Sequence, residues 1–103
     1  MYKISFYVPE NAVELVKSAL FDAGAGRLGN YDSCSWQTLG DGQFRALEGS
    51  NPTIGQHGRT EVVPEYRVEL VCDETHIEDA ILALRHSHPY EEPAFDVIKL
   101  EKF

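Results

Sequence analysis

The order of the periodic patterns along the chain constrains its fold more than any other feature of the sequence. The patterned stretches are, in chain order, residues 2–8, 9–23, 33–44, 66–72 with a start as early as 61, 75–86 and 95–100. The first, third and fourth alternate apolar and polar residues as half-buried strands do, and the last is β-branched and apolar. The second and fifth repeat apolar residues at helical spacing. This order is the split βαβ arrangement, so we predict an α+β, ferredoxin-like fold: a four-stranded antiparallel sheet with two helices on one face.

Local residues refine the ends of these elements. Gly24 suits the left-handed residue that closes a helix, and Thr75 to Glu78 has the form of a capping box at the start of the next one. Gly40-Asp41-Gly42 predicts a second strand that frays at its far end, and Pro64 predicts an interruption in the ladder of the third.

Residues 46–60 are rich in glycine and poor in apolar side chains, which predicts a long loop between the second and third strands. Long loops in compact domains are commonly functional or mobile. We therefore expect this segment to contact a ligand or a partner.

Size and charge exclude several classes of protein. A chain of 103 residues has room for one domain, residues 1–103, with one core. Nine Lys and Arg against seventeen Asp and Glu give a formal charge of −8 with no basic cluster, so we expect no binding to nucleic acid or to an anionic membrane surface.

The N-terminal residues alternate in polarity, unlike a secretion signal, and no apolar run reaches transmembrane length. The two cysteines, Cys34 and Cys72, are too few for a disulfide framework. These observations favour a cytoplasmic protein without a membrane segment.

The segment from His86 to Glu92 gathers two imidazoles and two carboxylates within seven positions. Such groups ligate divalent metals when a fold brings them together. Histidines near the C-terminus of a helix also interact favourably with its dipole, and Tyr90 suits a core position, so a structural or interface role is the favoured interpretation. The alternative is a metal site, and a divalent metal is the one cofactor that the sequence suggests. Its candidate ligands are His57, His86, His88 and Glu91.

Two other patterns that can mark a cofactor site or a catalytic site lack the neighbouring elements or residues that such sites need. Gly24 to Gly29 matches GxGxxG, but it follows a helix and leads into a strand, which is the reverse of a dinucleotide site. No serine or cysteine stands beside a base, so the sequence offers no credible nucleophile.

Several segments together resemble the inserted domain of Nif-three-like proteins. They are the glycine turn 24–31, the strand Cys34-Ser35-Trp36, Gly40 to Phe44, Gly55 to Glu61, Glu65-Tyr66-Arg67 and the run HPYEEPAFD at 88–96. The resemblance covers nearly the whole chain. It implies a fold similar to PII signalling proteins and CutA, which assemble as trimers through their sheets, and it suggests an effector-binding role. The metal-binding halves of the larger proteins are missing here, so the chain looks like the insertion existing alone and their proposed hydrolase activity does not transfer.

Taken together, the sequence predicts a self-associating binding or regulatory module, more a binding protein than an enzyme. A homo-oligomer is expected because one face of the predicted sheet has no helices, and the resemblance to PII proteins and CutA favours a trimer over a dimer. A protein partner that docks on loop 46–60 is the other interpretation. Our candidate ligand or interface residues are Tyr31, Trp36, His57, Arg59, Tyr90, Glu91 and Glu92.

Overall fold

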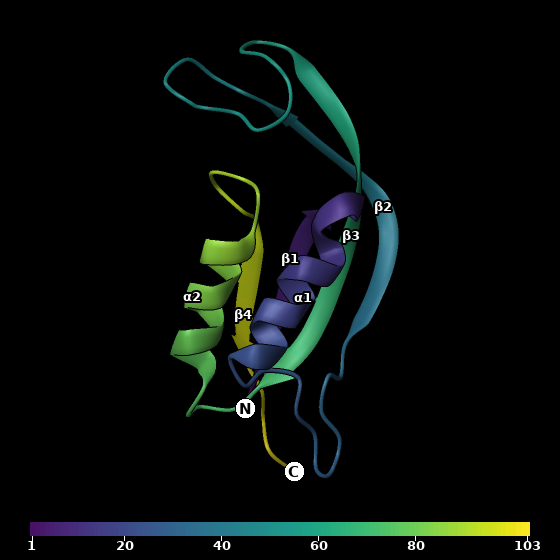
Figure 1. Ribbon diagram of the computed structural model, residues 1–103, viewed down its shortest axis with the longest axis vertical. Coiled ribbons are helices and arrows are strands. Elements are labelled where there is room, and N and C mark those ends of the chain that lie inside the picture. Colours follow the sequence, from purple (N-terminus) through teal and green to yellow (C-terminus); the bar gives the residue numbers. More distant parts are fainter.

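The computed structural model, which describes residues 1–103, has the predicted ferredoxin-like fold (Figure 1). Its elements are β1 (Tyr2–Pro9), a short 3-10 helix (Glu10–Ala12), α1 (Val13–Asp22), β2 (Trp36–Arg45), β3 (Thr60–Cys72), α2 (Ile77–Ser87) and β4 (Phe95–Lys99). The strands form one antiparallel sheet in the order β2-β3-β1-β4. None of the helices is both long and apolar enough to cross a membrane.

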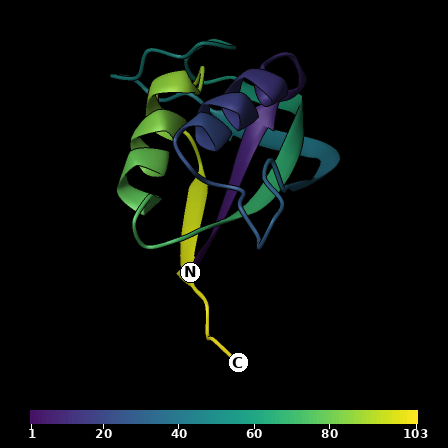
Figure 2. The same ribbon diagram turned by 60° about the horizontal axis from the view of Figure 1, so that its bottom comes forward.

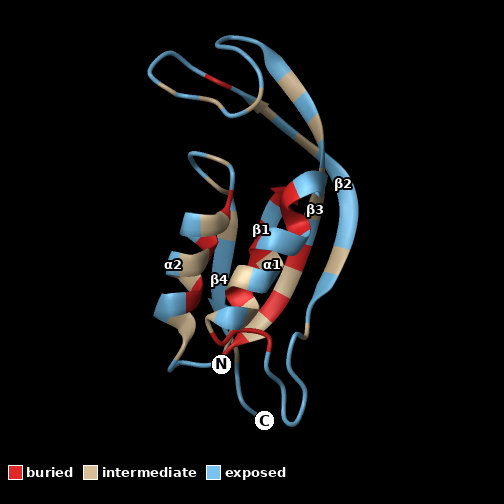
Figure 3. Ribbon diagram, in the orientation of Figure 1, coloured by how far each residue is buried: buried red, intermediate tan, exposed pale blue.

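The core lies between the sheet and the two helices, which cover the same face (Figure 2). Alternate residues of the two central strands point into it, and the inner sides of α1 and α2 close it (Figure 3). The central members are Ile4, Phe6 and Val8 of β1, Val68, Leu70 and Cys72 of β3, Val16 and Leu20 of α1, and Ala80 and Leu84 of α2. The other set of alternate residues, including Tyr7, therefore lies on the face without helices, which we call the open face.

Gly24 ends the first helix, as predicted. Its φ of 102° is in the left-handed region, and the N–H groups of Ala23 and Ala25 donate to the carbonyls of Ala19 and Leu20. A Cβ at Gly24 would also overlap the ring of His76, so only glycine fits this position.

The predicted capping box of the second helix does not form. The N-cap residue is His76 and the helix begins at Ile77, one residue beyond the position that would let Thr75 cap it. Asp73 bonds the start of the helix instead. Its carboxylate accepts the backbone N–H of His76 at 2.9 Å and lies 2.7 Å from Nδ1 of the His76 ring. That contact with the ring lowers the pKa of Asp73.

β2 does not fray at its glycines, so that prediction was wrong. The ladder between β2 and β3 runs without a gap from Trp36, opposite Glu69, to Arg45, opposite Thr60. Pro64 does not interrupt it, because β1 ends opposite Glu65 and leaves this part of β3 with a neighbour on one side only.

The far half of the β2–β3 pair projects beyond β1 as a curved hairpin, which makes the chain 46 Å long but only about 25 Å wide (Figure 1). Residues 46–59 connect its strands and confirm the predicted loop. The loop is joined to the segment between α2 and β4, because Thr53 Oγ1 donates to the Pro89 carbonyl at 2.8 Å and the Asn51 N–H donates to Glu91 at 3.0 Å.

Candidate functional site

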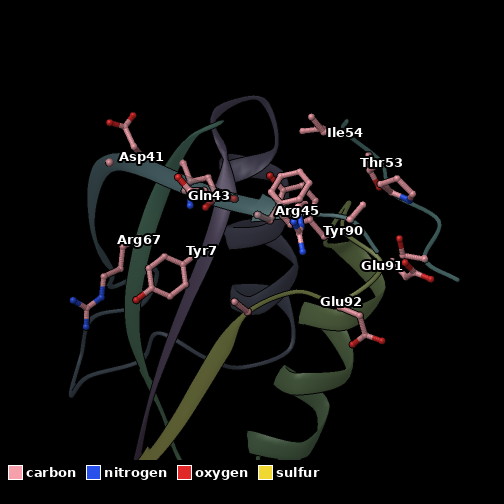
Figure 4. Close-up of a pocket in the computed structure, with 18 of the residues that line it drawn as sticks. Tyr7, Asp41, Gln43, Arg45, Thr53, Ile54, Arg67, Tyr90, Glu91 and Glu92 are labelled. Atoms are coloured by element: carbon pink, nitrogen blue, oxygen red, sulfur yellow. The ribbon is translucent and has the colours of Figure 1, made fainter. Parts of the chain in front are cut away.

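A groove of about 640 Å³ lies where the projecting hairpin, loop 46–59 and segment 88–94 meet (Figure 4). Its volume is within the range of small-molecule sites. Tyr7, Thr38 and Arg67 form one cross-strand row at one end, so the groove opens onto the open face. Phe44, Leu47, Pro52, Ile54 and Ala94 supply apolar walls, and the polar lining includes Asp41, Gln43, Arg45, Glu65, Tyr90, Glu91 and Glu92.

His88 holds the segment that forms one wall of the groove. The β1–β4 ladder ends at Phe95, after which Tyr7 N–H still donates to the Ala94 carbonyl at 3.3 Å. The Tyr7 carbonyl lies 2.6 Å from His88 Nε2, so the imidazole takes the place that another strand N–H would have. His88 Nδ1 in turn accepts the backbone N–H of Tyr90 at 3.1 Å.

These two contacts fix the protonation state of His88. A carbonyl can only accept, so Nε2 carries the hydrogen, and Nδ1 must be bare to accept the Tyr90 N–H. The residue is 6% exposed, and burial lowers the pKa of the imidazole against the opposing effects of the Tyr7 carbonyl and Glu65. His88 is therefore a neutral structural residue of the groove wall.

Tyr90 places a phenol inside the groove. Its ring packs against His88, with centroids 5.1 Å apart, and against Phe44, at 6.1 Å and an angle of 56°. The hydroxyl is buried and has no hydrogen-bond partner that meets normal geometry, although the Glu65 carboxylate is near. Burial first, and Glu65 second, raise the pKa of Tyr90 well above its usual value. Because buried hydroxyls are nearly always bonded, the Tyr90 oxygen is the unusual feature of the groove lining.

Glu65 lies on the same face of the hairpin, and Gly42 makes room for it. A Cβ at Gly42 would overlap the Glu65 carboxylate, whereas the same atom at Gly40 would meet nothing within 4 Å. The glycine in the middle of β2 thus marks the close approach of a functional side chain.

The groove has more negative than positive side chains. None of its four carboxylates takes part in an ion pair. Of its two guanidinium groups, Arg67 is paired with Glu69 of the open face at 2.8 Å. Arg45 stands exposed at the rim between the groove and a shallow depression beside His57. The lining therefore carries a net negative charge, with four carboxylates against two guanidinium groups.

The structure separates the predicted site residues into three sets. Tyr90, Glu91 and Glu92 line the groove. Tyr31 and Trp36 do not line the groove: Tyr31 lies in the segment that leads into β2, Trp36 begins β2 two residues before the groove residue Thr38, and the two are 76% and 60% exposed. His57 and Arg59 belong to the loop and its junction with β3 but do not line the groove; His57 Nε2 lies 2.8 Å from the Ser50 carbonyl, and Arg59 pairs with Glu61.

The predicted metal ligands are not brought together. No group of three or more His, Cys, Asp or Glu side chains in the chain could hold a metal ion. Both ring nitrogens of His88 are occupied by the backbone, His86 is exposed on the last turn of α2, and Glu91 accepts the Asn51 N–H. The residues present do not fit a metal site, and the metal hypothesis stays a prediction without geometric support.

The chain resembles known proteins in both sequence and structure. No protein-family model matches the sequence. The GTP cyclohydrolase 1 type 2 homolog of Mycobacterium tuberculosis is 48% identical over 94 residues, which are 91% of this chain and 25% of that protein. A Bacillus cereus protein related to NIF3 has a TM-score of 0.83 and 38% identity over 98% of this chain and 26% of its own.

The chain is homologous to one segment of NIF3-family proteins. It spans about a quarter of the length of the curated relatives that it matches. The PII-like protein CutA from Nostoc shares the fold, with a TM-score of 0.68 and 15% identity over 98% of this chain and 82% of its own. The predicted NIF3-related identity and PII/CutA-like fold are thus confirmed.

Phe44, Glu65 and Gly42 are among the groove residues that were not recognised in the sequence. Glu65 is one of seventeen acidic residues, and nothing in its neighbours distinguishes it. Gly42 did give a signal, since a glycine inside a strand commonly marks a close approach, but the same signal is compatible with a frayed end.

Proposed function

We propose that the domain is a self-associating regulatory module that binds a small organic molecule in the groove. The observation that carries this proposal is the buried Tyr90 hydroxyl without a partner, inside a concave site of ligand size. The lining offers binding groups and no nucleophile beside a base, which supports binding over catalysis.

Neutral aromatic fragments test the location of the site. We expect indole, followed by two-dimensional NMR of the labelled protein, to shift the backbone amides of Phe44, Tyr90 and Ala94 most strongly. Ala94→Phe fills the groove and should abolish these shifts, whereas Leu15→Phe on the exposed side of α1 should keep them. Shifts confined to the helices, or unchanged by Ala94→Phe, would contradict a groove site.

The open face is the surface that we propose for self-association. It exposes Trp36 and Ile98, at 60% and 54%, on the two edge strands, with the half-exposed Tyr7 between them. Large exposed apolar residues on an uncovered sheet face are typical of an interface. Because Tyr7 belongs to both the open face and the groove, assembly through this face would enclose one end of the groove and couple ligand binding to assembly.

Light scattering tests the assembly. We expect a mass of about three chains at micromolar concentration, and a monomer for Trp36→Lys, which places a charge in the proposed interface. Leu82→Lys, on the exposed side of α2, is the control and should leave the mass unchanged. A monomeric unmodified protein, or an oligomer that dissociates only in the control, would refute the interface.

A further inference from the structure

We infer that the groove selects an organic cation, a primary amine or amidinium on a flat apolar body, with its charged group against Glu65 and Tyr90. This inference rests on the proposed binding function and narrows it to one chemical class. Four features of the groove carry it: an unpaired carboxylate, an unbonded phenol, an aromatic corner and apolar walls.

The first feature is the missing counter-ion of Glu65. This side chain is half-buried and lies against Gly42, and it takes part in none of the ion pairs of the chain. Two titratable groups near its carboxylate, Tyr90 and His88, supply no positive charge, because burial disfavours the charged form of each. A carboxylate that is partly desolvated and unpaired gains more from a cation than an exposed one does.

The second feature is hydrogen bonding. The Tyr90 oxygen has lone pairs that no protein group uses, and an ionised carboxylate can only accept. A ligand group that contacts both oxygens must therefore bring two or more N–H donors. Ammonium and amidinium groups provide these, and hydrogen bonds that involve charged groups are about twice as strong as neutral ones. A ligand carboxylate would instead bring acceptors toward Glu65.

The third feature is the pair of rings from Phe44 and Tyr90. They meet at 56° with centroids 6.1 Å apart, and so form two sides of an aromatic corner beside Glu65. Cations are attracted to the faces of such rings, and aromatic corners and cages recognise ammonium groups in other proteins. The fourth feature is the apolar wall that the loop contributes. Leu47, Pro52 and Ile54 line the groove and would contact the apolar body of the ligand.

The electrostatics of the rim point the same way. Asp41, Glu91 and Glu92 add negative charge to that of Glu65, whereas Arg45 is the one guanidinium of the lining without an ion-pair partner. Asp41 points outward at one side in Figure 4, and Glu91 and Glu92 lie at the other. With a chain charge of −8, the field draws cations to the groove and repels anions.

Three probes of the same shape and different charge test the inference. We expect benzamidinium to bind at least tenfold more tightly than neutral benzamide in calorimetry at low salt, and benzoate to show no binding. The preference should weaken as salt is added, because part of it comes from rim charges. Benzamide or benzoate binding as tightly as benzamidinium would overturn the inference and leave the proposed function intact.

Variants of the pocket assign the effect to Glu65. Glu65→Gln keeps the shape and should remove most of the preference for benzamidinium over benzamide, leaving only the smaller, salt-sensitive part that comes from the rim charges. Glu74→Gln, an exposed carboxylate in the β3–α2 turn, should leave the tenfold preference unchanged. Tyr90→Phe should weaken benzamidinium about fivefold through loss of one hydrogen bond. A tenfold preference that survives Glu65→Gln would refute the assignment.

Gly42→Ala is a second way to move the Glu65 carboxylate. The new Cβ would displace the far end of the flexible Glu65 side chain, so the fold is kept while the carboxylate moves. We expect a loss of benzamidinium affinity in the unmodified background and no further loss in Glu65→Gln, because both changes act on one group. If indole binds the groove but benzamidinium does not, the inference fails alone; if no probe binds, the proposed function fails with it.

Discussion

Phe6→Ala is expected to lower the free energy of unfolding by about 3–5 kcal/mol, the largest effect of any single change considered for this chain. Phe6 is fully buried in β1, opposite Val68 of β3 and Phe95 of β4, and packs under both helices. Removing its ring takes apolar surface out of the core and leaves a cavity that two strands and two helices cannot all close. Urea denaturation followed by circular dichroism measures the loss.

Leu82→Ala is the matched control. Leu82 lies on the outer side of α2 with 65% of its surface exposed, so its truncation should change the free energy of unfolding by less than about 0.5 kcal/mol. Equal losses for the two variants would mean that the core is not organised around β1. Phe6 also adjoins Tyr7, so the same variant should broaden the NMR signals of the groove.

The sequence was sufficient to predict the fold because its periodic patterns are strong and local. The alternation of Ile4, Phe6 and Val8 sets which face of β1 is buried, and the strand and helix order then leaves few topologies. The errors came from weak local signals. Thr75 fits a capping box, yet the turn that Asp73 forms with His76 starts the helix one residue later.

The groove was only partly predictable for a different physical reason. Tyr90, Glu91 and Glu92 were recognised because they are clustered in sequence. Phe44 and Glu65 join them through the β2–β3 register and the curvature of the hairpin, which no local pattern encodes. Tyr31 and Trp36 are the converse: conspicuous in sequence, they do not line the groove, although Trp36 is only two residues from Thr38 at its end.

The polar residues of the His86–Glu92 segment are compatible with a metal site or with a structural role, and only their hydrogen bonds distinguish the two. An imidazole ligates a metal through a free ring nitrogen. His88 has none, since Nε2 serves the Tyr7 carbonyl and Nδ1 the Tyr90 N–H. The structural interpretation thus has a specific meaning here: His88 completes the end of the β1–β4 ladder and holds Tyr90 in the groove.

His88→Phe is therefore expected to lower the free energy of unfolding by about 2–3 kcal/mol. Phenylalanine fills a similar volume but leaves the Tyr7 carbonyl and the Tyr90 N–H without partners in a buried site. His86→Gln, on the exposed end of α2, is the control and should stay within about 0.5 kcal/mol. Loss of the indole-induced shifts in His88→Phe, with secondary structure retained, would show that the histidine positions Tyr90. Unchanged shifts would contradict that role.

The pH dependence of stability gives a second, independent measure of the same contact. The pKa of His88 is lowered in the folded protein, so between the ordinary histidine value of 6.5 and the folded value the unfolded chain binds the proton and the folded chain does not. Stability should be fully present above pH 6.5 and fall as the pH drops below it. Once protonated, Nδ1 would direct a hydrogen at the Tyr90 N–H, and the turn that presents the phenol would open.

Two variants test whether His88 causes this pH dependence. Because Glu65 partly opposes the lowering of the His88 pKa, Glu65→Gln should make the loss of stability at low pH steeper, and His88→Phe should make it shallower. Urea denaturation of the three proteins from pH 8 to pH 5 measures the slopes, and equal slopes in all three would exclude His88 as the group responsible.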